Sequence, residues 1–235
     1  PGPDEGCDFE DEAGLFTQVE DIIRRNKGKK IIFETHHPLF SVGNHGGYFH
    51  PSRLFFPLLD VHKALYVPLP GFIYTLYRKY LGSIQDLAHP EYKILKNTFL
   101  EVFREYPDII YAAGHEHNLQ YLDHNSLHHI VSGGGGEGTY IRKKAKKTDF
   151  AMAGAGLSIL NFYASGDVWV EFWTPGDGND GELAFRHKLF NREVYDPEKE
   201  YKYLSSLNFS DSVVQVRLSD IYNKGRIVRF WMCDN

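Results

Sequence analysis

The first half of the chain alternates between apolar residues at helical spacing and short, continuous apolar runs. Helical spacing predicts helices over residues 12–26, 72–81 and 91–105. Apolar runs predict buried strands over residues 30–35 and 109–113. Residues 51–70 lack a clear period and are predicted to be irregular or short-helical. Helix, turn and buried strand in this order indicate a layered α/β arrangement.

After residue 113 the pattern becomes that of antiparallel strands. Strands are predicted over residues 119–122, 127–131, 157–164, 168–173 and 183–190. Ser165-Gly166-Asp167 has the composition of a tight hairpin turn between two of them. From residue 191 the chain becomes polar, so residues 191–235 are predicted to be a linker or the start of a following module.

Composition places the chain among ordinary globular proteins. Its 235 residues are 42% hydrophobic and 24% charged, which excludes a disordered or fibrous chain. A formal net charge of −5 provides no overall basic field, so no nucleic acid is expected as a partner. The chain has only two cysteines, and this number excludes a cysteine-based zinc site. The unusual features are twelve histidines and an aromatic content of 15%.

Aromatic side chains gather in and after the irregular region. They are Phe49, Phe55, Phe56, Tyr66, Phe72, Tyr74, Tyr77 and Tyr80. Such a run can form an interface with a partner, or it can pack into the core of a proline-rich insertion. Core packing is the favoured interpretation, because aromatic side chains bury large apolar areas in protein cores.

The strongest chemical signal is Gly114-His115-Glu116-His117-Asn118, which directly follows the strand predicted over residues 109–113. Ligand sites in open α/β sheets gather at the carboxyl ends of strands. Two histidines one residue apart in extended or turning backbone point in different directions. They therefore suit two adjacent metal ions better than one, and a polar loop with solvated histidines is the alternative.

A second histidine pair, Thr35-His36-His37-Pro38, follows the strand predicted over residues 30–35. The pair alone can bind a metal ion or simply end the strand. Neutral imidazole suits Zn, Fe, Mn and Cu better than Ca or Mg. Because both motifs follow buried strands, together they favour a metal site at one sheet edge. His124, His128 and His129 flank a predicted turn and are interpreted as structural.

These motifs resemble two consecutive blocks of the purple acid phosphatases, within the calcineurin-like metallophosphoesterase superfamily. His36-His37-Pro38-Leu39-Phe40-Ser41, followed by His45-Gly46, resembles the fourth block. The segment from Ile110 to Leu122 resembles the fifth block. Ile130-Val131-Ser132-Gly133-Gly134-Gly135 resembles the strand and glycine run that follow it. The order and spacing of the motifs agree with the family.

The resemblance implies a role for each matching histidine. His36 and His115 would bind the more labile metal ion, and His117 would bind the other one. His45 would be a catalytic residue that contacts the substrate phosphate without binding metal. The family has an aromatic residue at the position of His37, so the choice between His36 and His37 as ligand stays open. The implied cofactors are two divalent or trivalent metal ions, which would be Fe, Mn or Zn.

The implied fold is α/β, an α+β layered domain that forms part of a two-sheet β-sandwich flanked by helices. Residues 1–190 would be the C-terminal half of a metallophosphoesterase domain that lacks its N-terminal strands, and residues 191–235 would follow it. The family's first three ligand blocks, which carry its carboxylates, are expected before Pro1. Three neutral imidazoles cannot alone hold two ions against hydration. We therefore expect residues 1–235 expressed alone to be inactive.

The implied function is hydrolysis of phosphate monoesters or diesters by a dinuclear metal centre, with a phosphate ester as the substrate. Ser83-Ile84-Gln85-Asp86-Leu87 further resembles a bacterial branch, some members of which are fused to an outer-membrane surface-antigen barrel. That branch implies export to the periplasm, outer membrane or cell surface, and association with the barrel module of the same parent chain.

Two other functions are compatible with the same motifs. The first is a non-catalytic phosphoesterase-like scaffold or interaction module at an outer membrane. The second is a standalone metal-binding protein that uses histidines only. The standalone protein is disfavoured, because its fold would leave a sheet edge unpaired where the family's first strands belong.

Overall fold

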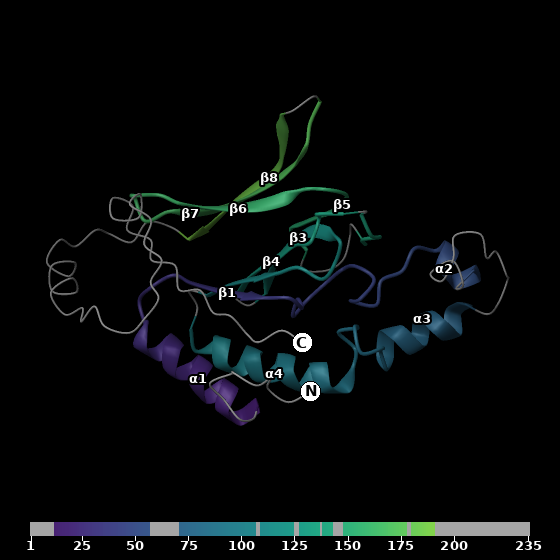
Figure 1. Ribbon diagram of the computed structural model, residues 1–235, viewed down its shortest axis with the longest axis horizontal. Helices are drawn as coiled ribbons and strands as arrows, with labels where there is room; N and C mark the ends of the chain where they lie inside the picture. The colour runs from purple at the N-terminus through teal and green to yellow at the C-terminus, as the bar shows by residue number, and fades with distance from the viewer. Residues whose placement is uncertain are drawn as a thin grey trace, which may run out of the picture.

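The structure is a computed structural model, and it describes residues 12–56, 71–106, 109–124, 127–136, 138–142, 148–177 and 180–190 (Figure 1). The linker or module predicted over residues 191–235 lies outside these ranges, as does Tyr66 of the aromatic run. Within them, the chain forms a five-stranded sheet, a three-stranded sheet and several helices. This arrangement confirms the predicted class, a mixed α/β fold with two sheets.

The elements follow the predicted periods closely. The helices in the described ranges are α1 (Glu12–Arg25), α2 (Ser52–Phe55), α3 (Gly71–Tyr80) and α4 (Pro90–Arg104). The larger sheet contains β1 (Ile31–Thr35), β2 (Ile109–Ala113), β3 (Asn118–His124), β4 (Leu127–Ser132) and β5 (Phe150–Ala153). The smaller sheet contains β6 (Leu157–Phe162), β7 (Val168–Pro175) and β8 (Gly181–Phe190). Only the short strand β5 was absent from the sequence prediction.

Strand order in the larger sheet brings the two histidine motifs to one edge. The order is β1-β2-β4-β3-β5, with β1, β2 and β4 parallel and β3 antiparallel to both of its neighbours. Thr35 at the end of β1 pairs with Ala113 at the end of β2. Because the two strands run in the same direction and end in register, the loops that follow them leave the sheet side by side.

The molecule is layered, with helices, the larger sheet and the smaller sheet in that order (Figure 1). Alternate residues of β1 face opposite sides, as the strand period requires. Phe33 packs with Ile23 of α1 and Phe99 of α4. Ile32 faces the other way and packs with Val170 of β7. Two apolar cores, one on each face, therefore fix the position of the strand that carries the first histidine motif.

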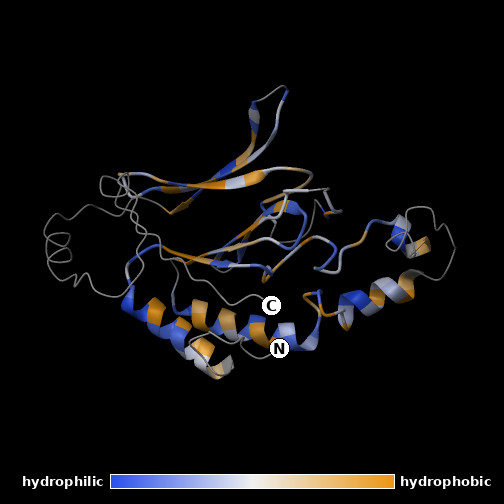
Figure 2. Ribbon diagram, viewed as in Figure 1, coloured by the Kyte–Doolittle hydropathy of each residue, from blue (hydrophilic) through white to orange (hydrophobic). Residues whose placement is uncertain are grey.

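Part of the aromatic run does not pack into the core as favoured above, although Phe49 and Phe56 are half-buried. Phe55, Phe72, Tyr77 and Tyr80 are all exposed, and Figure 2 shows apolar residues on α3, at the end of the molecule away from the sheets. The core-packing interpretation is therefore wrong for these residues. None of the described helices has the length and apolarity needed to cross a bilayer.

His129 anchors the start of the loop that follows His37. Its side chain is fully buried on β4, and Nε2 accepts hydrogen bonds from the backbone N–H of Leu39 at 3.0 Å and of Phe40 at 3.4 Å. Burial lowers its pKa to about 3. The ring is therefore neutral at pH 7 and can accept from both donors, which agrees with a structural role.

Acid should weaken the fold through His129. The unfolded chain binds a proton at the ordinary histidine pKa of 6.5, whereas the native ring stays neutral until about pH 3. Stability from this residue is therefore complete above pH 6.5 and is lost as the pH falls toward 3, by about 1.4 kcal/mol per pH unit at most.

We expect His129→Gln to reduce this pH dependence, because the Gln side chain keeps an acceptor oxygen but does not titrate. Urea unfolding of both proteins at pH 7 and pH 5 measures it. The free energy of unfolding should fall less between the two pH values in the variant. An equal fall in both proteins would show that His129 is not the titrating group.

Candidate functional site

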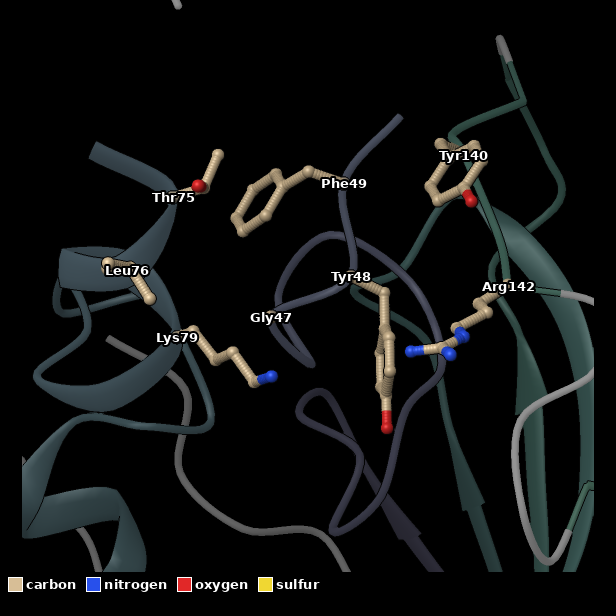
Figure 3. A pocket seen from close by; sticks show the side chains of 8 residues that line it. All are labelled: Gly47, Tyr48, Phe49, Thr75, Leu76, Lys79, Tyr140 and Arg142. Carbon is tan, nitrogen blue, oxygen red and sulfur yellow. The ribbon is translucent and has the colours of Figure 1, made fainter. Parts of the chain in front are cut away.

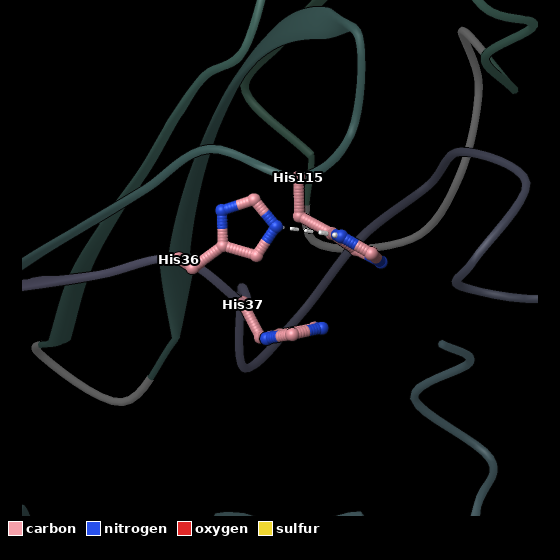
Figure 4. Close-up of side chains that lie close together, drawn as sticks. All are labelled: His36, His37 and His115. Atoms are coloured by element: carbon pink, nitrogen blue, oxygen red, sulfur yellow. Dashed lines mark hydrogen bonds between the residues drawn. The ribbon is translucent and has the colours of Figure 1, made fainter. Parts of the chain in front are cut away.

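Three histidine side chains meet where β1 and β2 end (Figure 4). His36 and His37 follow β1, and His115 follows β2. One ring nitrogen of each lies within 4.8 Å of the others. Nε2 of His36 is 3.1 Å from Nδ1 of His115, and the rings of His37 and His115 have centroids 4.2 Å apart. The group therefore contains imidazoles from both motifs, with His36 and His37 both included.

The hydrogen bond of His115 to Gln85 directs the lone pair of its Nδ1 atom toward Nε2 of His36. Its Nε2 lies 2.9 Å from the backbone oxygen of Gln85. A carbonyl oxygen only accepts, so Nε2 carries the proton and donates it. Burial lowers the pKa of His115 to about 4, so the ring is neutral at pH 7 and Nδ1 is unprotonated. A ring nitrogen oriented in this way by a carbonyl on the opposite nitrogen is typical of metal-binding histidines.

The backbone at His115 is strained. Its φ is +61°, and it is the one non-glycine residue with positive φ in the described ranges. This left-handed conformation costs an L-residue about 1–2 kcal/mol. Strain of this kind concentrates at functional sites, where the surrounding structure holds the residue in place. Here the turn aims the His115 ring at the loop that follows β1.

His117 does not join the three clustered histidines. Its side chain is exposed, and the group within 4.8 Å contains only His36, His37 and His115. The backbone oxygen of His117 accepts a hydrogen bond from the N–H of Thr139 at 2.8 Å. The structure thus brings together the predicted ligands His36 and His115, adds His37, and leaves His117 apart from them.

His45 lies beside the group and is oriented by a carboxylate. Its ring packs on His115 with centroids 4.2 Å apart, and its Nδ1 is 3.2 Å from Oδ1 of Asp86. Burial by itself would raise the pKa of Asp86, but hydrogen bonds from Arg78, His45 and Ser83 outweigh it and hold that pKa well below its usual range. Asp86 is therefore ionised and accepts the Nδ1–H of His45. The Nε2 atom of His45 is then available to a ligand.

Arg78 competes weakly for the same nitrogen. Its Nη2 lies 3.4 Å from Nδ1 of His45, and a guanidinium can only donate. Arg78 already forms an ion pair with Asp86, whose oxygen is closer to His45. The arrangement therefore favours donation from His45 to Asp86. Sequence reasoning missed this role of Asp86, because the only signal was one acidic residue within a motif that suggested no chemistry of its own.

A buried carboxylate joins the two histidine loops. Oε1 of Glu116 accepts hydrogen bonds from Oγ of Ser41 at 2.6 Å, from N–H of His45 at 2.9 Å and from N–H of Gly46 at 3.2 Å. Gly43 makes room for it, since a Cβ there would lie 2.5 Å from Oε2 of Glu116. The residue between His115 and His117 therefore positions the loop that carries His45.

A cavity of about 400 Å³ opens beside this loop (Figure 3). It is lined by Gly47, Tyr48, Phe49, Thr75, Leu76, Lys79, Tyr140 and Arg142. Lys79 and Arg142 are its cationic side chains, whereas none of the three clustered histidines lines it. The cavity is therefore a neighbour of the histidine site and not the space between its ring nitrogens.

Comparison with known proteins gives a distant structural likeness and no match in sequence. No protein-family model and no curated protein matches the chain. Among solved structures, the chain is similar to one described as GAP50, the anchor in the inner membrane complex of Plasmodium. The sequence identity is 17% and the TM-score 0.49, over 88% of this chain and 52% of that chain. The chain thus spans about half the length of that protein, and its function has to be argued from the site itself.

The fit between Gly43 and Glu116 predicts a sharp difference between two glycine substitutions. Gly43→Ala should destabilise the protein by roughly 1–3 kcal/mol, because the new Cβ must displace a buried carboxylate and the loop it holds. Gly135→Ala is the matched control, since a Cβ there meets nothing within 4 Å. Urea unfolding of both variants tests this, and equal stabilities would contradict the proposed packing.

Proposed function

We propose that this chain supplies histidine ligands and a catalytic histidine to a metal-dependent phosphoesterase. The proposed family is the calcineurin-like metallophosphoesterase superfamily, in its purple acid phosphatase-like branch, with the two sheets as part of that fold's sandwich. One observation carries the proposal: ring nitrogens of His36, His37 and His115 lie within 4.8 Å at the carboxyl ends of parallel strands. Beside them, the ring of His45 packs on His115 and contacts the ionised Asp86.

The donor set fits a transition-metal ion. Two nitrogens about 2.1 Å from a shared tetrahedral ion lie about 3.4 Å apart, and the His36 and His115 nitrogens are 3.1 Å apart. Neutral imidazoles of this kind suit Zn, Fe or Mn. His36 and His115 would hold the ion together, with His37 as an alternative or additional ligand. Such an ion supplies Lewis-acid chemistry, acidifying bound water and stabilising negative charge on phosphate oxygens.

A dinuclear centre is the finer part of the proposal, with His117 as the proposed ligand of the second ion. Within the described ranges the clustered ligands are imidazoles, which carry no negative charge. Carboxylate ligands for two cations would therefore come from outside those ranges. The same observation favours the alternative function, a non-catalytic phosphoesterase-like scaffold. Export and association with an outer-membrane barrel rest on the sequence resemblance alone.

His45 is proposed to act on the phosphate ester directly. Because Asp86 accepts the Nδ1–H, Nε2 faces away from the carboxylate and can exchange a hydrogen bond or a proton with a ligand. Asp86 is in turn held by Arg78 and by the backbone N–H and hydroxyl of Ser83. With a second proton on Nε2, a histidine oriented by a fixed carboxylate is suited to donate to a phosphate oxygen or to protonate a leaving group.

Metal binding tests the ligand assignment without any assay of activity. Calorimetric titration of the chain with Zn²⁺ or Mn²⁺ should show binding that His115→Asn weakens by at least roughly 10- to 100-fold. Asn tolerates the left-handed backbone of His115, so the turn itself should persist. His50→Asn is the matched control, because His50 is an exposed histidine whose Nδ1 contacts Ser52. Unchanged affinity in both His115→Asn and His36→Asn would contradict a shared ion.

Catalysis is tested in the longest natural chain that contains these residues, with an aryl phosphate as substrate. His45→Asn should lower kcat by about 10²- to 10⁴-fold while the metal content stays constant. Asp86→Asn should lower kcat less than His45→Asn does and should shift the pH–rate profile, because it changes the orientation of the His45 ring but leaves the ring in the site. If the His45→Asn variant lost its metal, the result would show that His45 is a metal ligand and would contradict its proposed role. Absence of chelator-sensitive hydrolysis in the natural chain would favour the scaffold.

A further inference from the structure

Helix α3 turns its polar side to the protein and its apolar side to solvent. Thr75 is 7% exposed, Arg78 is paired with the buried Asp86, and Lys79 lines the cavity beside the histidine loop (Figure 3). The exposed apolar side chains of α3 are Phe72, Ile73, Tyr74, Leu76, Tyr77 and Tyr80. At about 100° per residue, they cover about 200° of the helix circumference. This is the reverse of an ordinary surface helix, whose apolar stripe faces the core.

The apolar surface continues beyond α3. Leu81 is 61% exposed and Ile84 is 77% exposed, directly after the helix, and Phe55 of the neighbouring α2 is 65% exposed. We call these residues and the exposed apolar residues of α3 the apolar end. Helices α2 and α3 lie at one end of the molecule, away from both sheets (Figures 1 and 2). An exposed apolar surface of this kind marks a site of interaction in a folded protein.

The chemistry of the apolar end fits a lipid surface better than a protein groove. A helix bound in a groove presents a narrower stripe of anchors at i, i+3, i+4 and i+7. An apolar arc of about 200° is instead suited to a medium that contacts a little more than half of the helix circumference. Three of the exposed residues are tyrosines, which favour the boundary between acyl chains and headgroups because their rings are apolar and their hydroxyls polar.

Charge at the rim of the apolar end has the sign that anionic lipids would attract. Lys79 is exposed, and Nζ of the exposed Lys93 lies 3.1 Å from the backbone oxygen of Tyr80, at the end of α3. Residues 71–85 contain no Asp or Glu. The first carboxylate after them, Asp86, is buried and paired with Arg78. Lys79 therefore has no carboxylate on its own helix, whereas α4, which carries Lys93, also carries the exposed Glu91.

We propose that α3 lies in the interface of a membrane containing anionic lipids, with its apolar arc among the headgroups and upper acyl chains. Its polar side stays on the protein through Thr75 and Arg78, so the helix can enter the interface without unfolding. The helix lies along the surface and does not cross the bilayer. This membrane contact uses none of the clustered histidines, so it stands whether or not the chain is a phosphoesterase.

Vesicle binding by the full 235-residue chain tests the proposal. The chain should co-sediment with vesicles of one part phosphatidylglycerol to three parts phosphatidylcholine, and less with phosphatidylcholine alone. The triple variant Phe72→Ser, Tyr77→Ser, Leu81→Ser should bind roughly tenfold or more weakly, because it removes inserted apolar surface. Lys79→Glu should weaken binding only to the anionic vesicles. The control variant, Leu157→Ser with Ile159→Ser, removes exposed apolar residues of β6 and should bind normally.

Three results would overturn the proposal. The first is equal vesicle binding by the triple variant and the unmodified chain, with folding of both verified by circular dichroism. The second is a dimer in sedimentation equilibrium that the triple variant dissociates, because the apolar end would then be covered by a second copy. The third is protection of α3 in the absence of vesicles, seen as slow exchange of its backbone amides and as tyrosine fluorescence that a soluble quencher does not reduce. Another part of the chain would then cover the apolar end.

Discussion

The carboxylate of Glu116 is the contact on which the arrangement of the candidate site depends. It is buried, and its Oε1 atom holds the hydroxyl of Ser41 and two backbone N–H groups of the loop that follows β1. Burying a carboxyl group without such partners costs free energy, so the hydrogen bonds from the loop stabilise its closed position over Glu116. Glu116 itself follows β2. One side chain therefore fixes two loops that come from separate parts of the chain, and the histidines of both loops meet as a result.

Parallel strand pairing explains why histidines so far apart in sequence can meet at all. Thr35 and Ala113 end their strands in register, so the residues that follow them begin from neighbouring points. His115 then adopts a left-handed backbone, which turns its ring toward His36 instead of continuing along β2. If the backbone had stayed extended at His115, successive side chains would have continued to alternate between the two faces of the sheet. The strain at one residue and the register of one strand pair together determine which histidines form the group.

Sequence reasoning predicted the elements well because their buried faces are apolar at the expected period. Phe33 and Ile32 show this on β1, where each faces a different core. It could not predict that His37 would join the group while His117 stays apart, because backbone torsion decides this and H-x-H spacing does not. Asp86 was missed for a related reason, since its partners Arg78 and His45 come from another helix and another loop. For α3 the period predicted a helix but the wrong inward face, because an ion pair fixes its orientation.

Arg78 links the apolar end to the candidate site. It projects from the protein side of α3, and its guanidinium binds Asp86, which in turn contacts His45. An ion pair with a buried carboxylate resists being broken, because either partner alone would remain desolvated. The helix is therefore held in its inverted orientation by the same contact that orients His45. A displacement of α3 would therefore reach the candidate site through Arg78 and Asp86, and it would act first on His45, which contacts Asp86 directly.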